Sequence, residues 1–258
     1  MVLLAERPEL WLLSHLHKDH TVGISTFLQR QRRGRIRVLC TRETGVLLDV
    51  YFPGHGLGPK LCLLDLDTPA SFELRGGGRV DITAIDARHC AGSAMFRVLY
   101  GGKRVLCTGD FRMETDPEGA FPSLFCSEPD RAGPEEFDAI RVDCTFLCAE
   151  DAAFPTREET MVSMWRHMAI ALRDEKSIVM PCGMLGYEPL VEYIGARLKE
   201  TGFGQIHVDD GHLTKLVAAR PGLGQYLTLV GRGARVHACT LAQELVSEIG
   251  RASCRERV

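Results

Sequence analysis

The sequence predicts a protein of the α/β class, with a mixed first unit followed by a second unit in which strands and helices alternate. Two glycine-rich turns, at residues 76–78 and 101–102, predict β-hairpins in the first unit. From about residue 155 onward, short apolar runs alternate with segments of helical periodicity. Such alternation is typical of an α/β unit.

The first unit opens with an apolar run, Leu10–Leu13, which predicts a buried strand. Residues 15–20 follow as a polar loop, and residues 21–29 have the pattern of a short helix. Further strands are expected at residues 36–40, 80–85, 94–100, 104–107 and 139–142. A helix is expected from residue 41 towards 51, and residues 112–136, rich in Pro, Gly, Asp and Glu, are predicted to form a long loop.

The second unit has clear helix signals. Thr156 and Glu159 form a capping-box pattern, T-x-x-E, which predicts a helix that ends near Arg173. Pro189 is expected in the first turn of another helix, which ends near Gly202. Short strands are expected at residues 177–181, 206–208 and 235–237.

Composition narrows the class of protein. The 258 residues have 45% hydrophobic and 25% charged residues, which is normal for a globular chain. The formal net charge of −3 means that any contact with nucleic acid needs a local basic surface. No apolar run has the length of a bilayer span, and the N-terminal residues lack the pattern of a signal peptide. The ten cysteines are therefore predicted to be mostly buried free thiols.

The stretch LLSHLHKDH, residues 12–20, concentrates metal-ligand types directly after the first predicted strand. Imidazole and carboxylate groups are the ligands that zinc and similar metals favour. His15 and His17 are two residues apart, so in an extended segment they point to the same side. Asp19 and His20 follow where the chain begins to turn into a helix, so they can face elsewhere. This arrangement predicts one ligand pair for each of two neighbouring metals.

Three further polar residues follow predicted strands: His89 in ARHCAGSAMF, Asp110 in LCTGDFR and Asp143 in RVDCTF. Loops at one edge of a sheet are where binding sites are commonly built. Taken alone, each aspartate fits an ordinary turn as well as a ligand. Together with the histidine cluster, they extend the predicted site.

A basic run, RQRRGRIR, stands between the first two predicted strands. Its arginines are Arg30, Arg32, Arg33, Arg35 and Arg37. They are candidates for contact with a phosphate backbone, and a solvated linker face is an equally good interpretation.

The motifs HLHKDH, HCAGSAMF, TGDFR, VDCTF and PTREE, in that order, resemble the metallo-β-lactamase-fold DNA nucleases of the β-CASP group, the DNA cross-link repair family. GYEPL and RVHAC further along also resemble that branch, and the resemblance spans Leu12 to about Thr240. HxHxDH alone is shared by hydrolases of many kinds. The resemblance implies a metallo-β-lactamase αβ/βα sandwich with a partial β-CASP α/β domain.

The resemblance also implies residue roles. The first metal would be bound by His15, His17 and His89; the second by Asp19 and His20; and Asp110 would bridge the two. Asp143 would orient the ligands by hydrogen bonding. Catalytic roles therefore fall to Asp19, His20, Asp110 and Asp143. The implied metal is Zn²⁺, as one or two ions, with Mg²⁺ or Mn²⁺ as alternatives at the second position.

The implied activity is hydrolysis of DNA phosphodiesters in repair or end processing, as a 5′ exonuclease, a structure-selective endonuclease or both. The implied partners are DNA with 5′-phosphorylated ends or single-strand/double-strand junctions, and repair-complex proteins. The implied location is the nucleus, and no membrane partner is implied. Alternatives remain: an RNA-processing β-CASP endonuclease, a small-molecule hydrolase on the same fold, or an inactive fragment of the nuclease.

The two ends depart from the family pattern, so we expect the chain to be truncated at both. The family's early strand and its aspartate are missing before Leu10, and the histidine of its later HSS-type motif is missing as well. Ala91 also stands where the family commonly has proline. The closing IGRASCRERV matches the translation of a sequencing-library adapter. We therefore expect a catalytic domain at residues 1–153, a partial β-CASP domain at 154–247 and a non-native tail at 248–258.

Overall fold

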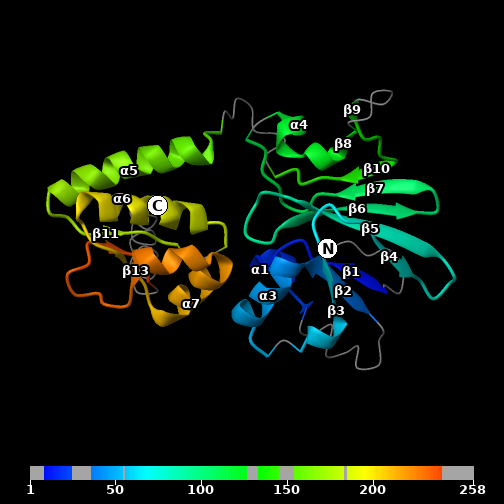
Figure 1. Ribbon diagram of the computed structural model, residues 1–258, viewed down its shortest axis with the longest axis horizontal. Helices are drawn as coiled ribbons and strands as arrows, with labels where there is room; N and C mark the ends of the chain where they lie inside the picture. The colour runs from blue at the N-terminus through cyan, green and yellow to red at the C-terminus, as the bar shows by residue number, and fades with distance from the viewer. Residues whose placement is uncertain are drawn as a thin grey trace, which may run out of the picture. The chain divides into compact units, whose positions relative to one another are not determined.

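The computed structural model describes residues 9–24, 36–54, 56–114, 116–126, 133–145, 154–182 and 185–239. The chain divides into two compact units, Met1–Ala152 and Ala153–Val258. Both appear in Figure 1, and each has its own hydrophobic core.

The first unit contains two main sheets. The smaller is parallel, in the order β1-β2-β3, and consists of β1 (Leu10–Leu12), β2 (Arg37–Thr41) and β3 (Leu61–Leu64). The larger has the order β10-β7-β6-β5-β4. Its strands are β4 (Ala70–Glu73), β5 (Arg79–Asp86), β6 (Ala94–Tyr100), β7 (Lys103–Cys107) and β10 (Ala139–Arg141). Strands β4 to β7 pair antiparallel, as the predicted hairpins require, whereas β10 pairs parallel to β7.

The two sheets pack face to face around a shared apolar core. Leu12 and Leu39 of the smaller sheet belong to the same buried cluster as Ile82, Ala84 and Phe96 of the larger one. The core between the two sheets forms the centre of the unit. Side chains alternate along a strand, so Ile85, which follows Ala84, faces the other side of the larger sheet, away from this core.

Helical segments cover the outer faces of both sheets. The helix α3 (Arg42–Tyr51) packs on β2 and β3 and buries Leu47 and Leu48. Beyond the larger sheet, Ile85 and Met95 pack against Phe121, between α4 (Pro117–Ala120) and η2 (Pro122–Leu124). The layers are therefore helix, sheet, sheet, helix, which confirms the predicted αβ/βα sandwich.

Several short elements were not expected. Residues 112–136, predicted as one loop, contain α4, η2 and a small antiparallel pair, β8 (Phe125–Cys126) with β9 (Gly133–Pro134). The other short helices are α1 (Lys18–Thr21) and η1 (Gly58–Lys60). The predicted helix at 21–29 lies largely outside the described residues.

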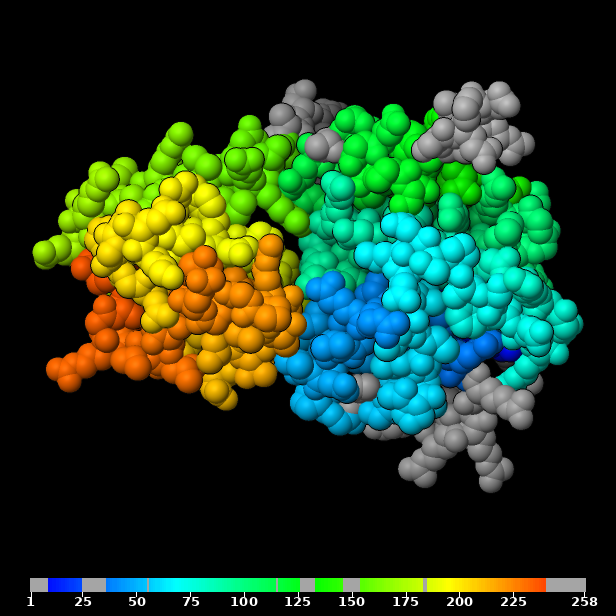
Figure 2. Space-filling view, viewed as in Figure 1, coloured from blue at the N-terminus to red at the C-terminus, as the bar shows by residue number. Residues whose placement is uncertain are grey.

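The second unit is built on a parallel sheet in the order β11-β14-β12-β13. Its strands are β11 (Ile178–Val179), β12 (Ile206–His207), β13 (Leu227–Thr228) and β14 (Val236–His237). Its helices are α5 (Arg157–Arg173), α6 (Glu188–Thr201), α7 (Asp210–Ala219) and η3 (Pro221–Tyr226). Figure 2 shows α6 and α7, in yellow and orange, side by side on one face of this unit. Parallel strands with helical connections give the α/β unit that the sequence predicts.

Local signals explain most of these helix ends. The Thr156 hydroxyl accepts a hydrogen bond from Glu159 N–H, and the Glu159 carboxylate accepts one from Thr156 N–H, which completes the capping box of α5. Gly202 ends α6 with a φ of 75°, a left-handed conformation that costs glycine little. In the described part of the chain, no helix has both the length and the apolar character needed to cross a bilayer.

Gly195 provides a test of the packing in the second unit. A Cβ atom added to it would lie 2.4 Å from Tyr226 Cβ and 2.7 Å from Tyr226 Cγ. We expect Gly195→Ala to lower the free energy of unfolding by about 1–3 kcal/mol, because the overpacking exceeds the gain in helix propensity. Urea denaturation of both proteins measures this difference.

The matched control is Gly211→Ala, also in a helix, where the contact recorded for an added Cβ among the described residues is Asp209 Oδ1 at 3.4 Å, an ordinary van der Waals distance. We expect this change to be neutral or to stabilise by roughly 0.5–1 kcal/mol. An equal loss of stability in both variants would contradict the packing of α6 on η3.

Candidate metal centre

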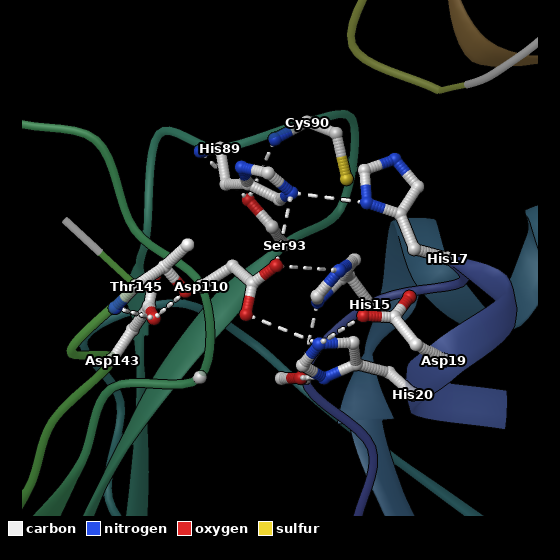
Figure 3. Close-up of polar contacts among 12 residues, drawn as sticks. His15, His17, Asp19, His20, His89, Cys90, Ser93, Asp110, Asp143 and Thr145 are labelled. Carbon is white, nitrogen blue, oxygen red and sulfur yellow. Dashed lines mark hydrogen bonds and ion pairs between the residues drawn. The ribbon is translucent and has the colours of Figure 1, made fainter. Parts of the chain in front are cut away.

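Three segments of the first unit meet at one site (Figure 3). His15 and His17 lie between β1 and α1, and Asp19 and His20 lie in α1 itself. His89 comes from the loop between β5 and β6, and Asp110 from the turn after β7. The six residues expected to bind metal are therefore brought together, although 95 positions of sequence separate the first from the last.

The first group consists of His15, His17, His89 and Asp110, which offer nitrogen and oxygen atoms within 4.8 Å of one another. His89 Nε2 is 3.0 Å from His17 Nδ1. Asp110 Oδ2 is 3.7 Å from His15 Nε2 and 3.6 Å from His89 Nε2. Three imidazoles and one carboxylate oxygen thus surround a common point.

The second group consists of Asp19, His20 and Asp110. His20 Nε2 is 3.1 Å from Asp110 Oδ1 and 3.3 Å from Asp19 Oδ2. Asp110 therefore directs one carboxylate oxygen at the histidines of the first group and the other at His20. This is the arrangement of a carboxylate that can bridge two cations.

The donor atoms of the cluster are better satisfied by a metal ion than by hydrogen bonds to one another. The His15 ring is fully buried, and its Nε2 has no hydrogen-bond partner among the described residues. A buried polar atom without a partner is costly, and a cation at the lone pair removes that cost. Nitrogen and carboxylate ligands in this mixture suit zinc and similar borderline metals.

The electrostatics of the cluster keep His15 neutral. Burial, as the largest cause, and the neighbouring His20, His17 and His89 together lower the pKa of His15 from 6.5 to about 2. Its ring centroid is 4.1 Å from that of His20 and 4.6 Å from that of His17. Several protonated imidazoles at such distances would repel one another, so the cluster favours neutral rings with lone pairs available.

Side-chain exposure increases across the site. His15 is fully buried, His20 is 19% exposed, His89 is 26% exposed and Asp110 is 29% exposed. Asp19 is 76% exposed. The site is therefore closed at His15 and open to solvent at Asp19.

The loop that carries His89 is fastened to the start of α3. The hydroxyls of Thr41 and Thr44 both donate to Gly92 O, at 2.8 and 2.7 Å. Ser93 Oγ accepts hydrogen bonds from the backbone N–H groups of His89 and Cys90. These bonds set the path of the loop, and sequence reasoning did not single out Thr41 or Thr44, because nothing in their local pattern distinguishes them from ordinary helix-start threonines.

Asp143 lies beside the turn that carries Asp110. Its N–H donates to Thr108 Oγ1, and its Oδ1 accepts hydrogen bonds from the N–H and hydroxyl of Thr145. These bonds from Thr145 lower the pKa of Asp143, and His89 and His20 contribute to the same direction. The carboxylate is therefore held as an anion next to the cluster, with its recorded hydrogen bonds directed at Thr145.

The arginine run is described only at its end. Arg30, Arg32, Arg33 and Arg35 lie outside the described residues. Arg37 starts β2, paired with Leu10, whereas the histidine cluster follows the other end of β1. Its guanidinium donates to Glu73 O and lies 5.1 Å from the centre of the Phe72 ring. Arg37 is thus placed at the end of the smaller sheet away from the cluster.

Gly92 tests the fastening of the His89 loop. It has a φ of 73°, and an added Cβ would lie 2.6 Å from Thr44 Oγ1 and 2.7 Å from Thr44 N. We expect Gly92→Ala to displace the loop and weaken zinc binding by at least tenfold, measured by competition with a chelating dye. Gly102→Ala is the control, because Gly102 has a φ of 75° but, apart from its chain neighbours, no atom of the described residues lies within 4 Å of an added Cβ. Equal zinc affinity in the two variants would show that the clash with Thr44 is immaterial.

The low pKa of His15 predicts how stability depends on pH in the metal-free chain. Below the ordinary pKa of 6.5, unfolded His15 takes up a proton that folded His15, with a pKa of about 2, does not. The free energy of unfolding should therefore fall as pH decreases from 6.5, with a contribution of up to about 1.4 kcal/mol per pH unit from this residue. Urea denaturation at several pH values, in the presence of a chelator, measures the slope. In His15→Gln the slope should be shallower by up to about 1.4 kcal/mol per pH unit, the contribution of one proton. An unchanged slope would contradict the low pKa of His15.

Comparisons with known proteins agree with this fold. Residues 4–172 match the family model of the β-lactamase superfamily domain. The chain is 26% identical to "Protein artemis" of Rattus norvegicus over 240 residues, which cover 89% of this chain and 33% of that protein. It is 30% identical to "5′ exonuclease Apollo" of Gallus gallus over 183 residues, 70% of this chain and 35% of that protein.

Two further matches are informative. "Endoribonuclease YSH1" of Kluyveromyces lactis is 28% identical over 230 residues, 78% of this chain and 28% of that protein. A crystal structure of a protein of unknown function from Enterococcus faecalis V583 matches with a TM-score of 0.51 and 14% identity, over 82% of this chain and 49% of that one. The chain spans about a third of the length of the Artemis and Apollo relatives. Since the family model covers well over half of its residues, the chain belongs to the β-lactamase superfamily, with the metallo-β-lactamase fold shared by its Artemis and Apollo relatives.

Proposed function

We propose that this chain is the catalytic part of a metal-dependent nuclease that hydrolyses DNA phosphodiesters. The observation that carries the proposal is the pair of ligand groups that share Asp110, because two adjacent cations are a common arrangement for phosphodiester hydrolysis. The names of the relatives Artemis and Apollo support the same reaction class, since Apollo is named as a 5′ exonuclease.

In this proposal His15, His17, His89 and Asp110 hold one cation, and Asp19, His20 and Asp110 hold the other. When bound, the cations supply Lewis acidity to water and to the phosphate oxygens. Zinc suits the first group, and zinc, magnesium or manganese suits the second, which has two carboxylates and one imidazole.

The chain's own residues prepare the site. Asp110 offers its two oxygens to the two groups and so sets their separation. Buried His15 excludes water from the rear of the site, while exposed Asp19 leaves the front accessible to a polymer strand. Asp143 contributes negative charge next to the ligands, and its role in the proposal is to help orient them.

The finer assignments are also part of the proposal. We place the catalytic domain at residues 1–153 and a β-CASP domain at residues 154–247. DNA with 5′-phosphorylated ends or strand junctions is the substrate, with repair-complex proteins as partners and the nucleus as the location. Arg30, Arg32, Arg33 and Arg35 of the basic run contribute to DNA binding through phosphate contacts in this proposal, whereas Arg37 lies away from the cluster.

A second candidate is an RNA-processing endonuclease. The match to an endoribonuclease over 78% of the chain favours it, because the same ligand groups serve both nucleic acids. Cleavage of 5′-phosphorylated single-stranded DNA, but not of RNA of the same sequence, distinguishes the two candidates.

We expect His17→Ala to abolish cleavage while leaving the fold intact, because it removes one of three imidazoles from the first group. The assay follows cleavage of 5′-phosphorylated DNA by the protein made from the complete reading frame that encodes this chain. Metal content by mass spectrometry and circular dichroism accompany the assay. The result expected is two metals per wild-type molecule and fewer in the variant.

The control is His167→Ala, the same histidine-to-alanine change at a residue on α5. There, His167 Nδ1 contacts Ser163 O. It should cleave DNA at the wild-type rate. Full activity in His17→Ala, or preferential cleavage of RNA by the wild type, would refute the DNA nuclease. Two bound metals without cleavage of either substrate would refute both nuclease candidates.

A further inference from the structure

Ser14 stands immediately before the histidine cluster, and its hydroxyl lies between two of the rings. Ser14 Oγ is 3.1 Å from His15 Nδ1 and 3.5 Å from His20 Nδ1. His15 belongs to the first ligand group and His20 to the second. One oxygen atom therefore contacts a histidine of each group, on the ring nitrogen that faces away from the cluster.

The surroundings of the other ring nitrogen, Nε2, indicate which nitrogen carries the proton. A neutral imidazole has one N–H and one lone pair, on different nitrogens. If His15 carried its proton on Nε2, that N–H would be a buried donor without an acceptor, because Nε2 has no hydrogen-bond partner among the described residues and Asp110 Oδ2 is 3.7 Å away. With the proton on Nδ1, the N–H donates to Ser14 Oγ and the lone pair faces the cluster.

His20 differs from His15, because its Nε2 has two carboxylate acceptors, Asp110 at 3.1 Å and Asp19 at 3.3 Å, and donates to them in the metal-free chain. A cation bound beside these carboxylates would take the place of that proton on Nε2. The remaining ring proton would then lie on Nδ1, which points at Ser14 Oγ. A hydroxyl oxygen has two acceptor lone pairs, so one serine can accept from both rings. The longer distance to His20 indicates that the His15 bond is the stronger.

The position of Ser14 is itself fixed by the segments that carry His89 and Asp110. Ser14 O accepts a hydrogen bond from Ala94 N–H, which follows the His89 loop. Gly109, next to Asp110, passes so close that a Cβ on it would lie 2.8 Å from Ser14 Cβ and 3.0 Å from Ser14 Oγ. The Ser14 backbone is therefore held close to the segments that carry His89 and Asp110.

We propose that Ser14 is a positioning residue that holds His15 and His20 in the Nδ1–H tautomer, so that both present Nε2 to the two cations. The inference rests on the proposed function, because it assumes that the cluster binds metal. In this proposal the Ser14 hydroxyl contacts one histidine of each ligand group on one side of the cluster. On the other side, the carboxylate of Asp110 belongs to both groups.

The test is Ser14→Ala in the chain with ¹⁵N-labelled histidine. Long-range ¹H–¹⁵N NMR of the metal-free chain near pH 8 reports which ring nitrogen carries the proton, and His15→Gln identifies the His15 signals. Wild-type His15 should be in the Nδ1–H form, and Ser14→Ala should shift it towards Nε2–H. Zinc affinity, measured by competition with a chelating dye, should fall by about ten- to a hundredfold.

Thr21→Val is the matched control. Thr21 lies in the same segment, but its hydroxyl donates to the backbone carbonyls of His17 and Lys18 and not to a ring. It should leave the His15 tautomer and the zinc affinity unchanged. A wild-type His15 in the Nε2–H form would overturn the proposal, as would a Ser14→Ala chain with weaker zinc binding but an unchanged tautomer. Failure of the wild-type chain to bind zinc would overturn the proposed function, and the tautomer measurement would still be readable.

Discussion

The site depends on one constraint: four imidazoles and two carboxylates, drawn from three separate segments, must share one small space, so that the donor atoms of each ligand group lie within 4.8 Å of one another. His15 is the point at which this constraint is strictest, because it is fully buried and surrounded by His17, His20 and His89. The low pKa of His15 keeps this ring neutral, and its buried lone pair then needs a partner. The arrangement has the character of a metal centre because cations are the partners that match such lone pairs.

The sandwich supplies the rigid frame for that crowding. The ligands lie on short segments next to the ends of β1, β5 and β7, and these strands are tied together by a continuous core. The connecting bonds are short and mostly made to the backbone, such as those from Thr41 and Thr44 to Gly92 O. A loop held in this way keeps its histidine in place without using the side chain of that histidine, which remains available as a ligand.

The two halves of the site differ in exposure, and this difference has a functional meaning. The first group contains the buried His15, whereas the second contains Asp19, which is largely in solvent. A carboxylate in water contributes a weaker electrostatic attraction than one in a dry site. The second position should therefore bind its cation less tightly and exchange it more easily, consistent with a wider choice of metal there. Asp110 and Ser14 link these unequal halves from opposite sides.

The sequence by itself determined the class of fold and pointed to the residue types that gather at the site. The hairpin turns and the T-x-x-E capping box depend on neighbouring residues, so they were correctly predicted. The short β13 and the helix α7, which begins at Asp210, were not expected from the sequence. The distance of Arg37 from the cluster, the two directions of the Asp110 oxygens and the contacts of Ser14 were decided only by tertiary structure. They depend on which strand ends meet in space, and no local pattern carries that information because the contacts join residues far apart in the chain.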